Sequence, residues 1–424
     1  MQSTVGLAKI EENRFWPRMY NNENRRYRTL WLGIFLYSWI LSLAPFIEKN
    51  YPNIFNFYFY VRFLVFLYIA FIVLLARKNK FAIWDRVITG AWAVIVISYI
   101  SVDVVSKNPS GVLYGLSIFS HIIVFRGLLN TRDKLVAALD STMWASITFI
   151  VISFLLTLMF PDFRVYANVK GYKILRAGGL AYNAQQLSLY VVTGFIFLLY
   201  KFNKLKKFKD RFFFISVISV VLAMSLLTGS RTALVSILFC GLIVYVLEYK
   251  SLSKLFYIIT AIMIVLAFAN SVGILNSFYE KFFLRGEKEN LLSLGLRIYL
   301  WKIGLSKFLE SPYWGHGYQT IREVLTPMGI KKIFMPHNGF LFIALDIGLI
   351  GLISFTIMLI RVFTLWKKLN KRELKYDKSI LNLAITIVLW GIIGNFTESW
   401  FFRFGFPPTW AFWLSIALIA IKHE

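Results

Sequence analysis

The stretch MPHNGFLFIALDIGLIG, residues 335–351, carries the most informative pattern in this chain. A polar pair, His337 and Asn338, is followed by nine mostly apolar residues and then by Gly348 and Gly351. This spacing predicts two polar side chains at the mouth of a membrane helix and two small residues in its body. Because the pair follows a long basic segment, we expect chemistry at a membrane surface.

The composition predicts an integral membrane protein. Of 424 residues, 58% are hydrophobic, whereas soluble domains are about 45–50% apolar. Since a span needs about 20 apolar residues, the chain has room for about twelve, in an all-α polytopic fold. The predicted spans are residues 30–47, 55–76, 87–106, 110–129, 141–160, 182–200, 212–229, 232–249, 255–275, 338–360, 379–397 and 406–421.

The basic residues predict the orientation of these spans, because Lys and Arg accumulate in cytoplasmic loops. Most of the 47 fall on the side that holds both termini, which we therefore place in the cytoplasm. The expected organisation is a cytoplasmic tail (1–29), nine transmembrane helices (30–276), a long outer loop (277–336), and three further helices with a short C-terminus (337–424).

Two predicted outer loops are unusually basic, namely 161–181 and 277–336. The first contains Arg176, and the second contains Arg297 and Arg322. Long loops can cross a membrane regardless of their charge, so the basic residues need have no role in binding. The alternative is that both loops converge on an anionic substrate outside, since arginine binds phosphate bidentately and stays charged.

Arg231 lies in LLTGSRTALVSILF (226–239), at the outer boundary between two predicted spans. An arginine at membrane depth is costly and usually faces a cavity or a partner, although its long side chain can also reach the interface. Small polar residues surround it, and a helix start can present backbone N–H groups to an anion. We therefore favour a functional role for Arg231.

Residues 291–309, within the long outer loop, predict an amphipathic helix from the spacing of their apolar residues. Arg297 and Trp301 are four residues apart and therefore share one face of this helix. For Trp301 the sequence favours packing or interfacial anchoring over a chemical role.

Five segments, in this order, resemble the signatures of the O-antigen ligase and polymerase superfamily. Three consecutive ones carry most of the likeness: GSRTALVSILFCGLIVYV (229–246), GLRIYLWKIGLSKFLESPYWGHGY (295–318) and PHNGFLFIALDIGLIGLISF (336–355). GGLAYNAQQLSLYVVTGF (178–195) resembles the upstream helix start, and TESWFFRFGFPPTWAFWL (397–414) resembles the last outer turn. The N-terminal third is similar only in hydropathy and topology.

This resemblance implies a membrane glycosyltransferase of GT-C-like architecture in the bacterial inner membrane. Such enzymes take a glycan from undecaprenyl diphosphate on the periplasmic side, invert the anomeric centre and need no metal. Ligases pass the glycan to the lipid A core oligosaccharide in lipopolysaccharide biosynthesis, and polymerases pass it to another lipid-linked repeat. The functional arginines and histidine of the family fall on Arg231, Arg297 and His337, and Arg176 stands where a further basic residue is expected.

The residues themselves agree with this chemistry. A lipid diphosphate leaving group needs positive charge, and the sequence has neither a DxD motif nor a carboxylate cluster in its outer loops, so we expect arginines in place of a metal and no cofactor. The acceptor hydroxyl needs a base. His337 is the favoured candidate and Glu398 the competing one, while Asn338 and Arg322 are candidates for orienting the base or binding the acceptor.

Three functions remain open. The ligase is favoured on the His337 motif spacing and the basic outer loops, and a repeat-unit polymerase using the same donor is the first alternative. The second is a transporter of lipid-linked glycans, which would show ionisable residues or broken helices near the membrane midplane. The predicted spans are poor in charge, with Arg62 as the main exception.

Overall fold

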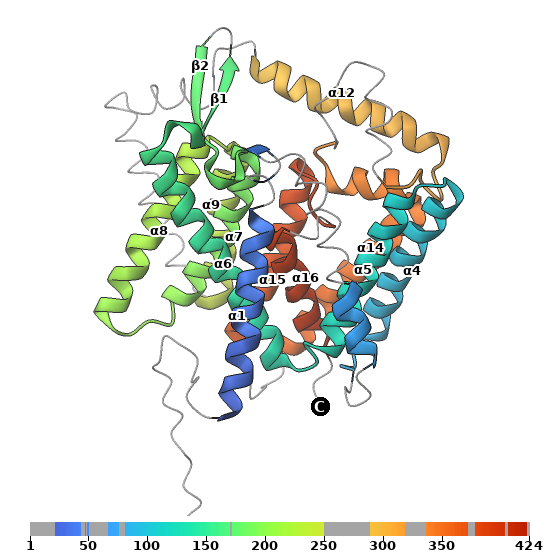
Figure 1. Cartoon of the computed structure of the whole chain (residues 1–424), viewed down its shortest axis with the longest axis horizontal. Helices are drawn as coiled ribbons and strands as arrows, with labels where there is room; N and C mark the ends of the chain where they lie inside the picture. The colour runs from blue at the N-terminus through green and yellow to red at the C-terminus, as the bar shows by residue number, and fades with distance from the viewer. Residues whose placement is uncertain are drawn as a thin grey trace, which may run out of the picture.

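The computed structural model describes residues 22–43, 47, 49–50, 67–75, 81–169, 172–249, 289–318, 336–371, 378–402 and 406–421. These residues are almost entirely helical (Figure 1). In that part of the chain, seven helices are long and apolar enough to cross a membrane. They are α4 (Arg86–Val105), α5 (Pro109–Gly127), α6 (Arg132–Met159), α8 (Phe208–Thr228), α9 (Arg231–Tyr249), α14 (Gly339–Lys371) and α15 (Lys378–Thr397).

Three further helices occupy other predicted spans. They are α1 (Asn22–Ser42), α7 (Ala184–Phe202) and the short, apolar α16 (Pro407–Ala420). The predicted span 255–275, most of 55–76 and Arg62 lie outside the described residues. An all-α membrane-integral architecture is therefore confirmed in outline, while the total of twelve spans and the GT-C-like arrangement stay predictions.

A β-hairpin is the exception to the all-α expectation. Strands β1 (Arg164–Val169) and β2 (Tyr172–Ala177) pair antiparallel, with Arg164 opposite Ala177. Two short 3-10 turns, η1 (Pro161–Phe163) and η2 (Gly179–Ala181), flank the hairpin. The sequence analysis treated 161–181 as a basic loop within an all-α fold and predicted no strand there. Strand β1 contains two valines and a tyrosine and β2 a tyrosine and an isoleucine, residue types that suit extended backbone. Pairing between the strands satisfies their backbone N–H and C=O groups.

The core is built around α7 and α16, whose side chains are buried on almost every face. Fully buried tryptophans fill the space between the helices, with Trp92 of α4 and Trp413 of α16 only 4.5 Å apart between ring centroids. Such rings bury large apolar areas. The outward faces of α8 and α9 expose Leu, Phe and Val instead, as expected of surfaces in contact with lipid.

One end of the helical bundle carries the segments of interest. Helix α12 (Glu289–Glu310) lies across this end, and the β-hairpin lies at the same end (Figure 1). The C-terminus lies at the opposite end (Figure 1). We call the end that carries α12 and the β-hairpin the α12 end; both elements come from segments predicted to be outer loops. The amphipathic helix expected at 291–309 is confirmed. Which compartment the α12 end faces stays a prediction.

Helix α14 is broken where the sequence has its two small residues. The break consists of Ile347 (φ −130°, ψ 17°) and Gly348 (φ 64°, ψ −166°), neither of which is helical. A positive φ suits glycine, which has no Cβ. At this point the usual hydrogen bonds from residue i to residue i−4 are lost, so the backbone groups of the turn need other partners.

A loop at residues 311–318 supplies these partners. The carbonyls of Leu345 and Asp346 accept from the backbone N–H groups of His316 (2.8 Å) and Gly317 (2.9 Å). The N–H groups of Leu349 and Ile350 donate to the carbonyls of Pro312 (2.8 Å) and Tyr313 (3.4 Å). The loop follows α12 directly, so the break fastens the C-terminal end of α12 to the middle of the bundle.

Two buried carboxylates stand beside the filled break. Asp346 of α14 is 1% exposed and accepts from the hydroxyl of Tyr99 at 3.2 Å. Asp103 of α4 is fully buried and accepts from the N–H of Tyr318 at 3.0 Å and from the Asn108 side chain at 2.9 Å. The spans are therefore less poor in charge than the sequence predicted. Asp346 and Oδ1 of Asp103 accept hydrogen bonds, while Oδ2 of Asp103 is buried without a hydrogen-bond partner among the described residues.

The other end of α14 is tied to α4 by an ion pair. The guanidinium of Arg361 bonds both carboxylate oxygens of Asp85, at 3.1 and 2.8 Å. Asp85 also caps α4 by accepting from the N–H groups of Val87 and Ile88. The hydrogen bonds from Arg361 hold the pKa of Asp85 below its ordinary value. Helices α4 and α14 are thus fastened together on both sides of the break.

Substitution of Gly348 by alanine should destabilise the protein. A Cβ at this position would lie 2.2 Å from the carbonyl oxygen of Tyr313, and the left-handed backbone would be strained as well. Alanine at a positive φ costs more than about 1 kcal/mol. We expect a clearly lower unfolding temperature in detergent for Gly348→Ala.

Gly90→Ala is the matched control, because a Cβ on this helical glycine of α4 meets nothing within 4 Å. That variant should unfold at or slightly above the wild-type temperature. Equal unfolding temperatures for the two variants would contradict the role assigned to the break.

Candidate active site

His337 stands immediately before α14 in an uncommon backbone conformation. Its φ is +50°, in the left-handed region, which is uncommon for residues other than glycine. Asn338 starts the helix, because its side-chain oxygen accepts from the N–H groups of Phe340 and Leu341, both at 3.0 Å. The two polar residues of the motif therefore differ in role: Asn338 caps the helix, and His337 lies just outside it.

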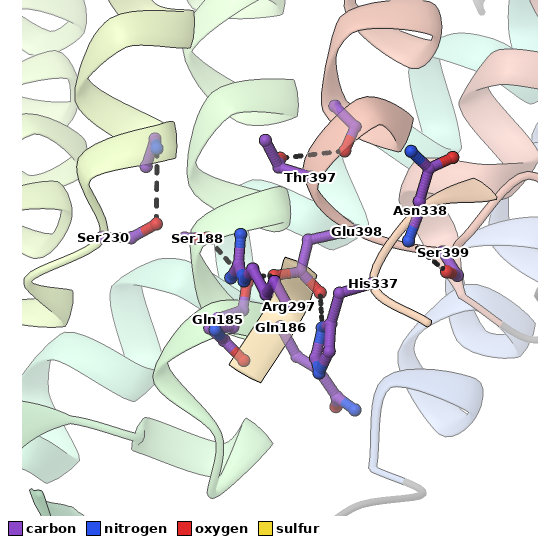
Figure 2. Close-up of polar contacts among 12 residues, drawn as sticks. Gln185, Gln186, Ser188, Ser230, Arg297, His337, Asn338, Thr397, Glu398 and Ser399 are labelled. Carbon is purple, nitrogen blue, oxygen red and sulfur yellow. Dashed lines mark hydrogen bonds and ion pairs between the residues drawn. The ribbon is translucent and has the colours of Figure 1, made fainter. Parts of the chain in front are cut away.

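Glu398 reaches the same place from the end of α15. Its Oε2 lies 3.0 Å from Nδ1 of His337, and its Oε1 lies 3.3 Å from Nη2 of Arg297 (Figure 2). The next residue, Ser399, accepts from the Asn338 N–H at 2.9 Å. The structure thus brings together three of the predicted site residues, one each from α12, α15 and the turn before α14.

The contact with Glu398 determines how His337 can act. A carboxylate only accepts hydrogen bonds, so the Nδ1 that faces it must carry the proton. In the neutral ring, Nε2 then keeps its lone pair and is free to accept a proton. Glu398 would also stabilise the imidazolium that results. The two residues that sequence analysis treated as competitors are therefore partners in one unit.

Helix α12 contributes two side chains, one turn apart. Arg297 contacts Glu398, and the Trp301 indole Nε1 donates to the carbonyl of Pro336 at 2.8 Å. The shared helix face predicted for these two residues is therefore seen in the structure. Behind them, Leu300 of α12 packs against Leu345 of α14. The side chains of Arg297, His337 and Glu398 are 24%, 29% and 16% exposed, so a ligand can reach them.

Arg231 and Arg176 meet at a second corner of the α12 end. Arg231 is the first residue of α9, after the left-handed Gly229 (φ 60°). Arg176 on β2 donates from its Nε to the carbonyl of Thr228, the last residue of α8, at 2.8 Å. The hairpin is thereby fastened beside the turn that carries Arg231. The structure brings these two predicted donor-binding residues to one turn of the chain.

Polar residues at the start of α7 were not singled out by the sequence. Asn183 caps this helix by accepting from the N–H groups of Gln185 and Gln186. Figure 2 draws both glutamines in the same view as Arg297, Glu398 and His337. The pattern NAQQ, a capping residue followed by two amides, was the available signal.

Two expectations remain outside what the geometry tests. Arg322 lies outside the described residues. Among the residues that are described, no group of three or more His, Cys, Asp or Glu side chains could hold a metal ion. The roles assigned to each residue in catalysis and binding stay predictions.

An apolar helical bundle with a histidine, a carboxylate and arginines at one end defines a membrane-integral protein with a polar site. Residues 214–356 match the family model for O-antigen ligase, a stretch that includes Arg231, Arg297 and His337. A comparison with curated proteins gives no match. The match covers about a third of the chain, and over this segment the protein is similar to the O-antigen ligase and polymerase superfamily.

Proposed function

We propose that this protein is an O-antigen ligase-type glycosyltransferase. It takes a glycan from undecaprenyl diphosphate and transfers it to the lipid A core oligosaccharide at the periplasmic face of the bacterial inner membrane. The α12 end of the bundle is then the periplasmic end, and both termini are cytoplasmic. The observation that supports this proposal best is the chain of contacts from Arg297 through Glu398 to His337, within a family segment that acts on lipid-linked glycans.

The first step proposed is removal of the acceptor proton. Nε2 of His337 accepts the proton of an acceptor hydroxyl, and the oxygen attacks the anomeric carbon of the donor sugar. Glu398 keeps Nδ1 protonated and balances the charge of the imidazolium, in the way that a carboxylate supports histidine in hydrolases. The proton leaves later to water, and the new glycosidic bond has the opposite anomeric configuration to the donor.

The second requirement is stabilisation of the leaving group. As the bond between the sugar and the diphosphate breaks, the electron pair and negative charge pass to undecaprenyl diphosphate. Arg231, Arg176 and Arg297 would offset this charge, because preorganised cations stabilise a developing anion strongly. Arg297 contacts Glu398 through one nitrogen only, and a guanidinium has five N–H donors. No metal or cofactor is needed in this scheme.

Both enzymes need the same donor site. The ligase is preferred to the polymerase because the spacing of the His337 motif, with nine residues between Asn338 and Gly348, and the basic segments at the α12 end fit the pattern expected of a ligase. A repeat-unit polymerase remains the first alternative.

A transporter of lipid-linked glycans is the second alternative, and one observation bears on it. The broken helix and the buried Asp346 are features that transporters place at their binding sites. Here the loop 311–318 fills the break, and its backbone satisfies the freed groups of α14. Because these backbone groups are already satisfied, the break supports the placement of α12 better than it supports a substrate-binding site of its own.

Purified protein in liposomes should transfer glycan from undecaprenyl diphosphate to lipid A core, in excess chelator, with release of undecaprenyl diphosphate. The reaction is followed by gel mobility of the glycolipid. Lengthening of the lipid-linked glycan, with lipid A core untouched, would favour the polymerase. Movement of the donor across the bilayer, with neither product formed, would support the transporter and exclude the proposal.

Replacement of His337 by alanine should lower turnover by about 10²–10⁴-fold, the usual contribution of general-base catalysis. Donor binding should persist, because the arginines remain. Glu398→Gln should have a smaller effect, since the base is still present. Turnover and donor affinity are measured for both variants in the same liposomes.

Glu310→Gln is the control for the loss of a carboxylate, because Glu310 at the end of α12 is exposed and forms an ion pair with Lys307 of the same helix. It should behave as wild type. If Glu398→Gln abolishes turnover while His337→Ala only weakens acceptor binding, the roles of the two residues must be exchanged.

Arg231→Lys should lose much of the activity, because an ammonium cannot replace a bidentate guanidinium. The expected loss is about 10- to 150-fold, the factor of a charge-assisted hydrogen bond. Arg164→Lys on β1 is the control, since the Arg164 guanidinium donates to the carbonyls of Thr157 and Leu158 at the end of the preceding helix α6. Donor binding by the purified variants provides the measurement, and wild-type affinity in Arg231→Lys would remove this residue from the donor site.

A further inference from the structure

We propose that Trp301 is a positioning residue for His337. This inference rests on the proposed role of His337 as the base. The indole Nε1 of Trp301 donates to the carbonyl oxygen of Pro336 at 2.8 Å. Trp301 comes from α12, while Pro336 and His337 belong to the turn before α14, so the hydrogen bond joins two separate elements.

The bond acts on the peptide plane that orients His337. The carbonyl of Pro336 and the N–H of His337 belong to one planar peptide unit. Rotation about φ of His337 turns this plane relative to the imidazole. Because the Pro336 oxygen is held by Trp301, the plane is held as well, and φ of His337 is restrained at its observed +50°.

This restraint matters because the conformation is not one that His337 would adopt by itself. Left-handed backbone is disfavoured for residues with a side chain and persists only where the surroundings impose it. On its C-terminal side, His337 is followed by Asn338, whose N–H donates to Ser399. On its N-terminal side, Pro336 contributes no N–H of its own. The hydrogen bond from Trp301 is therefore the fastening seen on that side.

Helix α12 consequently holds the imidazole from two directions. Arg297 steadies Glu398, which bonds Nδ1, and Trp301 steadies the backbone that carries the ring. The position of Trp301 is itself fixed, because the neighbouring Leu300 is fully buried and α12 continues into the loop that fills the α14 break. The proposed role is orientation: Trp301 keeps Nε2 of the imidazole directed toward the place of the acceptor hydroxyl.

Trp301→Phe tests this role, since phenylalanine keeps an aromatic ring but has no N–H. We expect kcat to fall about 5- to 10-fold, the factor of one ordinary hydrogen bond, with the donor KM unchanged. Trp39→Phe is the matched control: the Trp39 indole donates to Thr148 Oγ1 at 2.9 Å between α1 and α6. Both variants should unfold at similar temperatures, but only Trp301→Phe should lose turnover.

A double-mutant cycle separates positioning from a general structural effect. If Trp301 acts through His337, Trp301→Phe should cause no further loss in a His337→Ala background, because coupled residues are not additive. An equal fall in both backgrounds, or wild-type kcat in the single variant, would overturn the inference.

A second measurement needs no enzymatic activity. Diethyl pyrocarbonate modifies histidines, and mass spectrometry gives the rate for each one. Trp301→Phe should change the rate at His337 but not at His316, whose Nε2 contacts the Lys307 carbonyl. Unchanged modification at His337 would contradict the positioning role. Full activity of His337→Ala would reject His337 as the base. If Trp301→Phe still altered the modification rate at His337, the positioning of this residue by Trp301 would nevertheless be supported.

Discussion

The break in α14 is the constraint on which the α12 end depends. Within a bilayer no water is present to satisfy free backbone groups, and each one left unpaired costs several kcal/mol. An unwound turn at Ile347 and Gly348 therefore demands a partner, and the loop 311–318 supplies four backbone hydrogen bonds. Because this loop is the direct continuation of α12, a requirement of the helix interior places α12 across the end of the bundle.

Glu398 connects α12, placed in this way, to the histidine before α14. Its two carboxylate oxygens contact a cation of α12 and the ring that precedes α14. A carboxylate shared in this way keeps the histidine in one tautomer and also links it to an arginine suited to phosphate. The pair that would remove a proton and a group that would stabilise a leaving anion are thus neighbours. One side chain joins the two halves of the proposed reaction.

The family segment and the site overlap only in part. Residues 214–356 include Arg231, Arg297 and His337, but the match ends before Glu398. Arg176, which is fastened to the end of α8, precedes the segment. The site is therefore completed by elements on both sides of the matched stretch.

The sequence by itself predicted the helices, because a bilayer allows few backbone conformations and a long apolar run in the sequence predicts a membrane helix. It also predicted the amphipathic helix α12, the shared face of Arg297 and Trp301, and the candidacy of His337 and Glu398 as site residues, since these follow from local patterns. It missed the hairpin at 164–177 and the buried Asp103 and Asp346, and it took Gly348 for a small residue in a continuous helix. Only the tertiary structure decided that His337 and Glu398 are partners, that Trp301 bonds Pro336, and that a loop fills the α14 break. Those contacts join residues far apart in the chain, and no local pattern encodes which distant group satisfies a given donor or acceptor.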